Sequence, residues 1–113
     1  MMDHVILNVS NYGRSQQFYS AALAPLGLEP SEADGFCGYG TFYITERSPV
    51  GGSVHVAFTA PDEEAVAAFH RAGLAVGGTD HGQPGPRPEI ADGYYAAFVL
   101  DPDGNNIEAV VQT

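Results

Sequence analysis

The sequence contains no lysine and no tryptophan, and only four arginines stand against fourteen aspartates and glutamates in its 113 residues. The formal net charge is therefore -10 at pH 7. This balance excludes a nucleic-acid partner, because phosphate contacts need a cluster of basic side chains that the chain cannot assemble. The acidic excess favours solubility and can help to attract a divalent cation.

Cysteine and long apolar runs are also scarce. Cys37 is the only cysteine, which rules out an internal disulfide and suits a reducing compartment. No apolar run approaches the roughly 20 residues that cross a bilayer. With 44% hydrophobic residues, the chain has the composition of a globular protein. We therefore expect a cytoplasmic protein with no membrane partner, folded as one domain around a single core.

The sequence pattern begins again near the middle of the chain. Residues His4–Val9 and His55–Ala60 both alternate like a strand, and each is followed by an amphipathic helical pattern with helix-capping residues at its start. Further strands are predicted at residues 28–33, 36–40 and 41–47, and again at 74–76, 94–100 and 106–111. The sequence therefore predicts two βαβββ modules, module 1 (residues 1–48) and module 2 (residues 54–113), with a linker at 49–53.

Residues 77–93 interrupt this pattern with five glycines and three prolines. A stretch of this length without periodicity is typically a lid or a binding loop in a small domain. We expect it to lie over a pocket as a loop that carries His81 and Arg87.

The segment Asp101–Glu108 predicts a tight hairpin between the last two strands. Pro102 and the Asp103-Gly104 pair suit a turn, and strand alternation then separates two rows of side chains. Ile107 belongs to the row that packs on the core, whereas Glu108 points to the opposite face. Glu108 is therefore at a wet surface or in a functional site.

The same alternation assigns His4, His55 and Glu108 to one shared face. If the modules pair about a pseudo-twofold axis, their first strands meet and this face curls into a cup. Two imidazoles and one carboxylate form a set that binds a divalent metal and leaves positions open for substrate. A single histidine near a strand start is more often an ordinary polar residue, but two at equivalent repeat positions favour the metal site.

These features resemble the vicinal-oxygen-chelate superfamily, which includes glyoxalase I, fosfomycin-resistance thiol transferases, extradiol dioxygenases and bleomycin-binding proteins. The resemblance covers essentially the whole chain and rests on the paired modules, the strands that begin at His4 and His55, and residues 98–108. It implies an α+β fold, in which two βαβββ modules form a cupped mixed sheet with two covering helices. It also implies metal ligands at His4, His55 and Glu108.

The resemblance also suggests further site residues. Tyr43 aligns with the fourth-strand position where related lyases and epimerases carry an acidic ligand. Tyr94, Ala96 and Phe98 are expected to point into the pocket. Tyr43 and Tyr94 either pack against their neighbours or donate hydrogen bonds in catalysis. Arg87 is either a solvated loop charge or a partner for a substrate carboxylate.

Three functions are compatible with the sequence. The leading hypothesis is an enzyme, a lyase, isomerase or oxygenase, in which Fe, Ni, Zn or Mn chelates two neighbouring oxygens of a small substrate. The alternative is a metal-free drug-binding (resistance) protein, which the charge and the six tyrosines and six phenylalanines favour. The third possibility is a structural protein that catalyses no reaction. The resemblance further implies a homodimer, and exposed sheet edges give a physical reason for one.

Overall fold

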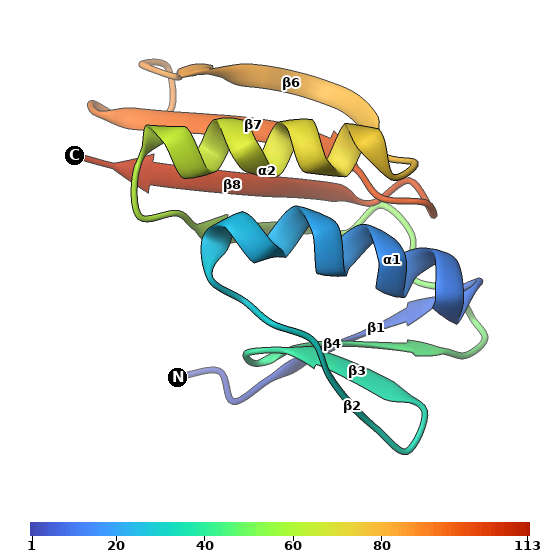
Figure 1. Cartoon of the computed structure of the whole chain (residues 1–113). Helices are drawn as coiled ribbons and strands as arrows, with labels where there is room; N and C mark the ends of the chain where they lie inside the picture. The colour runs from blue at the N-terminus through green and yellow to red at the C-terminus, as the bar shows by residue number, and fades with distance from the viewer.

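The computed structural model describes all of residues 1–113 and consists of two units with the same order of elements (Figure 1). In module 1 these are β1 (Val5–Val9), α1 (Tyr12–Leu23), the 3-10 turn η1 (Ala24–Leu26), β2 (Ser31–Ala33), β3 (Phe36–Tyr39) and β4 (Phe42–Glu46). In module 2 they are β5 (His55–Thr59), α2 (Glu63–Ala75), β6 (Thr79–Pro86), β7 (Tyr94–Leu100) and β8 (Asn106–Gln112). The predicted α+β fold with two βαβββ repeats is confirmed.

Each module forms its own four-stranded mixed sheet with the same topology. The strand orders are β1-β4-β3-β2 and β5-β8-β7-β6, and the first strand of each sheet runs parallel to the last. The remaining pairs are antiparallel. No ladder joins β1 to β5, so the two first strands do not merge the sheets into one. As a result, residues at equivalent positions of the two modules lie on two different sheets.

Both helices begin at a side chain that satisfies a free backbone N–H. Asn11 accepts a hydrogen bond of 2.9 Å from the backbone N of Arg14 at the start of α1, and Asp62 accepts one of 2.8 Å from Ala65 at the start of α2. Glu63 and Glu64 add negative charge in the first turn of α2, where the helix dipole favours it. The predicted helix starts are confirmed.

The two helices lie next to one another across the middle of the molecule and share one core with both sheets (Figure 1). Leu7 and Val9 of β1, Val99 of β7 and Ile107 of β8 belong to this core of 18 buried residues. Strand alternation then turns the other row of each strand away from the helices. The predicted inward and outward rows of β1, β7 and β8 are confirmed.

The prediction for residues 74–93 was wrong in two respects. Residues 74–75 belong to the last turn of α2 rather than to a strand, and residues 79–86 form β6 rather than a loop. β6 is the edge strand of its sheet and pairs with β7 through a register that shifts twice. An edge strand accommodates prolines because one side of its backbone needs no partner, and this hides the strand in the sequence. Neither helix is long and apolar enough to cross a membrane.

Candidate functional site

The site is built on the two parallel strands β5 and β8 of module 2. Ala57 lies opposite Glu108 in this ladder, so His55 and Glu108 project from the same face. Nε2 of His55 lies 2.7 Å from Oε1 of Glu108. The Glu108 residue is 2% exposed, whereas the His55 side chain is 52% exposed. A buried carboxylate is thus held against an imidazole that remains open to solvent.

Tyr94 occupies the second oxygen of the same carboxylate. Its hydroxyl donates a hydrogen bond of 2.5 Å to Oε2 of Glu108 from the neighbouring strand β7. This hydrogen bond, together with burial and the negative charge of Glu108, raises the pKa of Tyr94 from 10.0 to about 12. Tyr94 therefore stays protonated at neutral pH and fixes the orientation of Glu108.

Phe98 extends this surface toward β6. It lies opposite Glu108 in the β7–β8 ladder, and its ring centroid is 6.0 Å from that of His55. The guanidinium carbon of Arg87 lies 5.4 Å from the same Phe98 centroid. We call the surface formed by His55, Tyr94, Phe98, Glu108 and Arg87 the module 2 face.

Module 1 carries the equivalent positions with different chemistry. Ile6 lies opposite Tyr43 in the β1–β4 ladder, as Ala57 lies opposite Glu108 in module 2. His4 precedes Ile6 by two residues, as His55 precedes Ala57. Tyr43 therefore occupies in module 1 the place that Glu108 occupies in module 2. The His4 and Tyr43 rings meet edge to face with centroids 6.0 Å apart.

Tyr43 can occupy this position because the neighbouring strand carries a glycine. Gly38 pairs with Tyr43 across β3 and β4. A Cβ atom added to Gly38 would lie 2.5 Å from Cε2 of Tyr43, which is too close for any side chain. The absence of a side chain thus allows the Tyr43 ring to lie over the sheet.

A cavity of about 680 Å³ opens over this face of module 1. We call it the module 1 cup. Its lining includes His4 and Tyr43, the apolar side chains of Ile6, Ala33 and Phe36, and acidic and polar residues: Asp3, Ser31, Asp34 and Thr41. No residue of module 2 lines it, so the cup lies apart from His55 and Glu108.

The structure therefore brings together two of the three predicted metal ligands. His55 and Glu108 are in contact, whereas His4 lies in module 1 with its Nδ1 atom 2.8 Å from Oδ1 of Asp3. Within one chain there is no group of three histidine, cysteine or carboxylate side chains placed to hold a metal ion. Imidazole and carboxylate are side-chain types that bind divalent cations, but a 2-His-1-carboxylate set would need a third ligand beyond His55 and Glu108.

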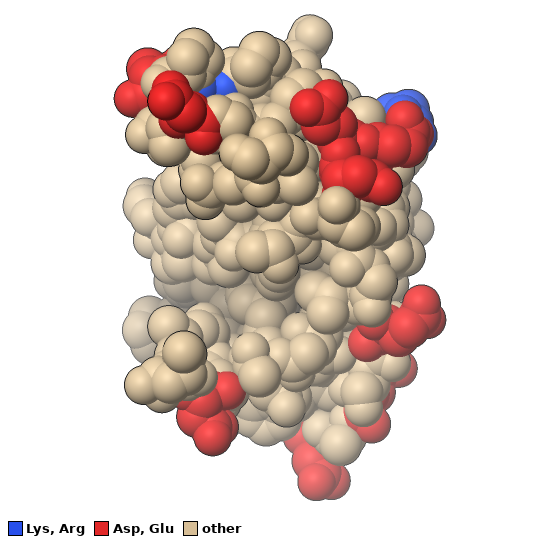
Figure 2. Space-filling view, turned by 90° about the vertical axis from the view of Figure 1, so that its left-hand side faces the viewer, with Lys and Arg blue, Asp and Glu red and all other residues tan.

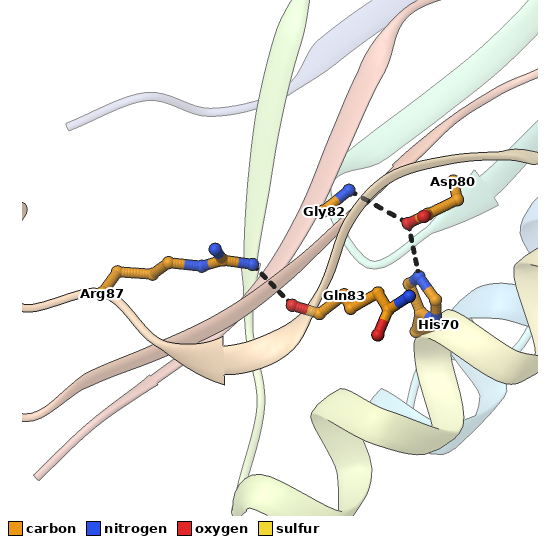
Figure 3. A network of polar contacts seen from close by, with 5 residues as sticks. All are labelled: His70, Asp80, Gly82, Gln83 and Arg87. Atoms are coloured by element: carbon orange, nitrogen blue, oxygen red, sulfur yellow. Dashed lines mark hydrogen bonds and ion pairs between the residues drawn. The ribbon is translucent and has the colours of Figure 1, made fainter.

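The strand β6, which ends one residue before Arg87, is attached to helix α2 by a polar network (Figure 3). Nε2 of His70 lies 2.9 Å from Oδ1 of Asp80, and the same oxygen accepts a 3.0 Å hydrogen bond from the backbone N of Gly82. These hydrogen bonds, that of His70 first, lower the pKa of Asp80 below its ordinary 3.8. His70 is 8% exposed, so the contact joins the buried side of α2 to the edge of the sheet.

The sequence analysis did not identify this network. His70 falls among the apolar residues of a helix, and Asp80 lies in the stretch that was interpreted as a loop. The sequence carries no spacing that links the two residues. Arg87 was identified, but its stacking on Phe98 depends on a strand that the sequence does not reveal.

The surface charge is uneven. Figure 2 shows acidic side chains at the upper and lower ends of the face turned to the viewer, two small basic areas, and a middle band without charge. Arg14, Arg47 and Arg71 are exposed, and Arg87 is the one arginine that is partly buried. A positive charge on the module 2 face is therefore a local exception in an acidic protein.

Comparison with known proteins shows a relationship over nearly the full chain. The model of the Glyoxalase/Bleomycin resistance protein/Dioxygenase superfamily matches residues 1–109. A solved glyoxalase/bleomycin resistance protein from Albidiferax ferrireducens is 37% identical, with a TM-score of 0.88, over 97% of this chain and 98% of that one. No curated protein sequence matches the chain.

Two further solved structures share the fold. A glyoxalase-related enzyme from Fulvimarina pelagi is 21% identical with a TM-score of 0.76, and the match covers 97% of this chain and 86% of that one. A glyoxalase I mutant from Zea mays is 27% identical with a TM-score of 0.67. That match covers 96% of this chain and 45% of the maize protein, so this chain corresponds to about half of it.

Proposed function

Because this chain belongs to the glyoxalase/bleomycin resistance protein/dioxygenase superfamily, we propose that it is a divalent-metal enzyme that works as a homodimer. Its substrate is a small molecule that presents two neighbouring oxygens. The observation that carries the proposal is the contact between His55 and the buried carboxylate of Glu108, which Tyr94 holds in place. The match over residues 1–109 supports the same reading.

In this proposal the metal ligands come from two copies of the chain. His55 and Glu108 of one subunit supply two of them, and His4 of the partner subunit supplies the third. The module 1 cup and the module 2 face occupy equivalent positions in the repeat. Within one chain the cup is open and the His55 side chain is 52% exposed. A twofold dimer that places each cup against the partner's module 2 face makes two identical composite sites.

Charge supports this pairing. The cup is lined by Asp3 and Asp34, while the module 2 face presents the guanidinium of Arg87. Opposite charges across an interface favour one orientation of the subunits over others. Ile6, which is 44% exposed in the cup, would be buried by the same contact.

The side chains of the site have distinct roles in this proposal. Tyr94 is protonated at neutral pH and keeps Glu108 in its ligand orientation. Tyr43 brings a second phenol, which can donate a hydrogen bond to a substrate oxygen from the partner's cup. When bound, an Fe, Ni, Zn or Mn ion would polarise the substrate oxygens as a Lewis acid. One fold and one ligand set support isomerase, lyase and oxygenase reactions alike.

Metal content and molecular mass test this function together. We expect purified protein to elute as a dimer by size-exclusion chromatography with light scattering, and to retain one divalent ion per chain after dialysis. A monomer, or a chelator-stripped dimer whose melting temperature does not change on addition of Fe(II), Ni(II), Zn(II) or Mn(II), would contradict the proposal. His81 is an exposed histidine outside the site, so a His81→Ala variant should have the same mass and metal content as the original protein.

A metal-free binding protein is the second candidate function, and the lining of the module 1 cup favours it. Phe36 and Tyr43 give aromatic surface, Asp3 and Asp34 give negative charge, and no arginine lines the cavity. Such a site suits a cationic aromatic drug. Tight binding of ethidium by metal-free protein, lost in a Tyr43→Ala variant, would support this function in place of the enzyme.

We also propose a cytoplasmic location. Cys37 is a free and buried thiol, which is the state that a reducing compartment maintains.

A further inference from the structure

Arg87 has hydrogen-bonding capacity that the protein does not use. Its Nη2 atom donates to the backbone oxygen of Gln83, whereas its Nε atom is buried and has no partner. Figure 3 shows the side chain extended toward the backbone oxygen of Gln83. Fourteen carboxylates are present in the chain, yet none forms an ion pair with Arg87. A partly buried guanidinium without an anion is costly unless a ligand completes it.

The surroundings of Arg87 hold the guanidinium in one place. Its carbon stacks on Phe98 at 5.4 Å from the ring centroid, and its backbone N donates a 2.7 Å hydrogen bond to the carbonyl of Tyr94. Gly82 leaves the space that this stack needs. A Cβ atom there would lie 2.8 Å from Cδ1 of Phe98 and 3.3 Å from Nη2 of Arg87. The Arg87 side chain is therefore held in one place. The preceding strand β6 is itself fixed to α2 through the contact between Asp80 and His70.

Phe98 also connects Arg87 to the proposed metal ligands. His55 has its ring centroid 6.0 Å from that of Phe98, on the surface that holds Glu108. Phe98 thus lies within contact range of both the guanidinium and the His55 ring, so one flat ligand beside Phe98 could reach Arg87 and the His55–Glu108 pair together. Guanidinium groups recognise carboxylates through paired hydrogen bonds.

We infer that Arg87 binds the carboxylate of the substrate, so that the substrate class is a planar carboxylic acid that carries two neighbouring oxygens away from the acid group. This inference rests on the proposed function, because the neighbouring oxygens are those that the metal takes. The carboxylate lies at Arg87, outside the metal ligands. Arg87 acts in binding and specificity and takes no part in the metal site.

Matched probes test the inference. 3,4-Dihydroxybenzoate carries both groups on one ring, and 3,4-dihydroxybenzamide differs only in the loss of the negative charge. By titration calorimetry on the metal-loaded protein, we expect the acid to bind roughly tenfold or more tightly than the amide, since hydrogen bonds to charged groups contribute that much. Arg87→Gln should remove this preference by weakening the acid alone, and Arg87→Lys should keep part of it.

Arg71→Gln is the control, because Arg71 is exposed and pairs with Glu64 at 3.5 Å on the surface of α2. It should leave both affinities unchanged. Equal binding of the two probes by the original protein, no binding of either, or an equal loss of both in Arg87→Gln would overturn the inference. Failure of the metal site is distinguishable, because the metal content of each variant is measured in the same samples and Arg87→Gln should retain its metal.

Discussion

Nε2 of His55 lies 2.7 Å from Oε1 of Glu108, across two parallel strands that are separated by about half of the chain. The carboxylate is buried, and Tyr94 occupies its other oxygen. A buried carboxylate that holds a half-exposed imidazole is an arrangement suited to binding and chemistry. The predictions below start from this contact.

Removing the Glu108 carboxylate should weaken metal binding. We expect Glu108→Gln to lower the affinity for Zn(II) by more than about tenfold, because an amide is a weaker ligand and no other carboxylate is placed to replace it. The measurement is a competition titration with a coloured chelator. Glu63→Gln, an exposed carboxylate on α2, serves as the control. Equal affinities for both variants would exclude Glu108 as a ligand.

The Tyr94 phenol should lose its proton at a higher pH than an ordinary tyrosine. The pKa of Tyr94 is raised to about 12 by its hydrogen bond to Glu108 and by burial, so its contribution to stability is fully present below pH 10.0 and is lost as the pH rises through 12. The difference in ultraviolet phenolate absorbance between the original protein and Tyr94→Phe reports this titration. In a Glu108→Gln background the same difference should move toward pH 10.0. An unchanged midpoint would show that Glu108 does not cause the shift.

The His70–Asp80 contact should make the stability of the fold depend on pH in the acidic range. The pKa of Asp80 is lowered, so its contribution is present above 3.8 and is lost as the pH falls below that value. Asp80→Asn should therefore reduce the urea midpoint at pH 6, and the gap to the original protein should close in strong acid. Asp92→Asn, on an exposed turn, is the comparison. A gap that stays constant with pH would rule out this ion pair as the source.

The turn before β8 should contribute to stability through α1. The buried Tyr19 hydroxyl donates a hydrogen bond of 2.5 Å to Oδ2 of Asp101, which also accepts from Asn105. Tyr19→Phe should lower the free energy of unfolding by about 1–2 kcal/mol, since a buried charged acceptor loses a donor. Tyr95→Phe is the matched control, because the Tyr95 hydroxyl has no hydrogen bond in the protein. Similar losses in both variants would argue for packing alone.

The sequence predicted those parts of the fold that local pattern determines. Alternation in β1, β5 and β8 correctly put Leu7 and Ile107 in the core and Glu108 on the other face. β6 was missed because its glycines and prolines resemble a loop, and only the pairing with β7 makes it a strand. The register of this pair shifts twice, so β6 shows no regular alternation that local spacing could reveal.

The position of His4 relative to His55 shows a second limit. The repeat predicts that the two histidines are equivalent, which the matching ladders confirm. It does not predict whether the two sheets join at their first strands. That choice depends on how α1 and α2 pack, and in this structure they pack on one another while the sheets stay separate. Repeat symmetry thus relates the two half-sites without bringing them together.

Subunit complementation is the most direct test of a metal site shared between two chains. His4→Ala and Glu108→Gln variants should each bind metal more than about tenfold more weakly than the original protein as homodimers, so that neither retains metal after dialysis. A heterodimer of the two, isolated with different affinity tags, should regain one metal ion per dimer, because one of its two sites receives His4 from one chain and His55 with Glu108 from the other. A heterodimer that binds no metal, or a His4→Ala homodimer that binds metal as tightly as the original protein, would contradict the account.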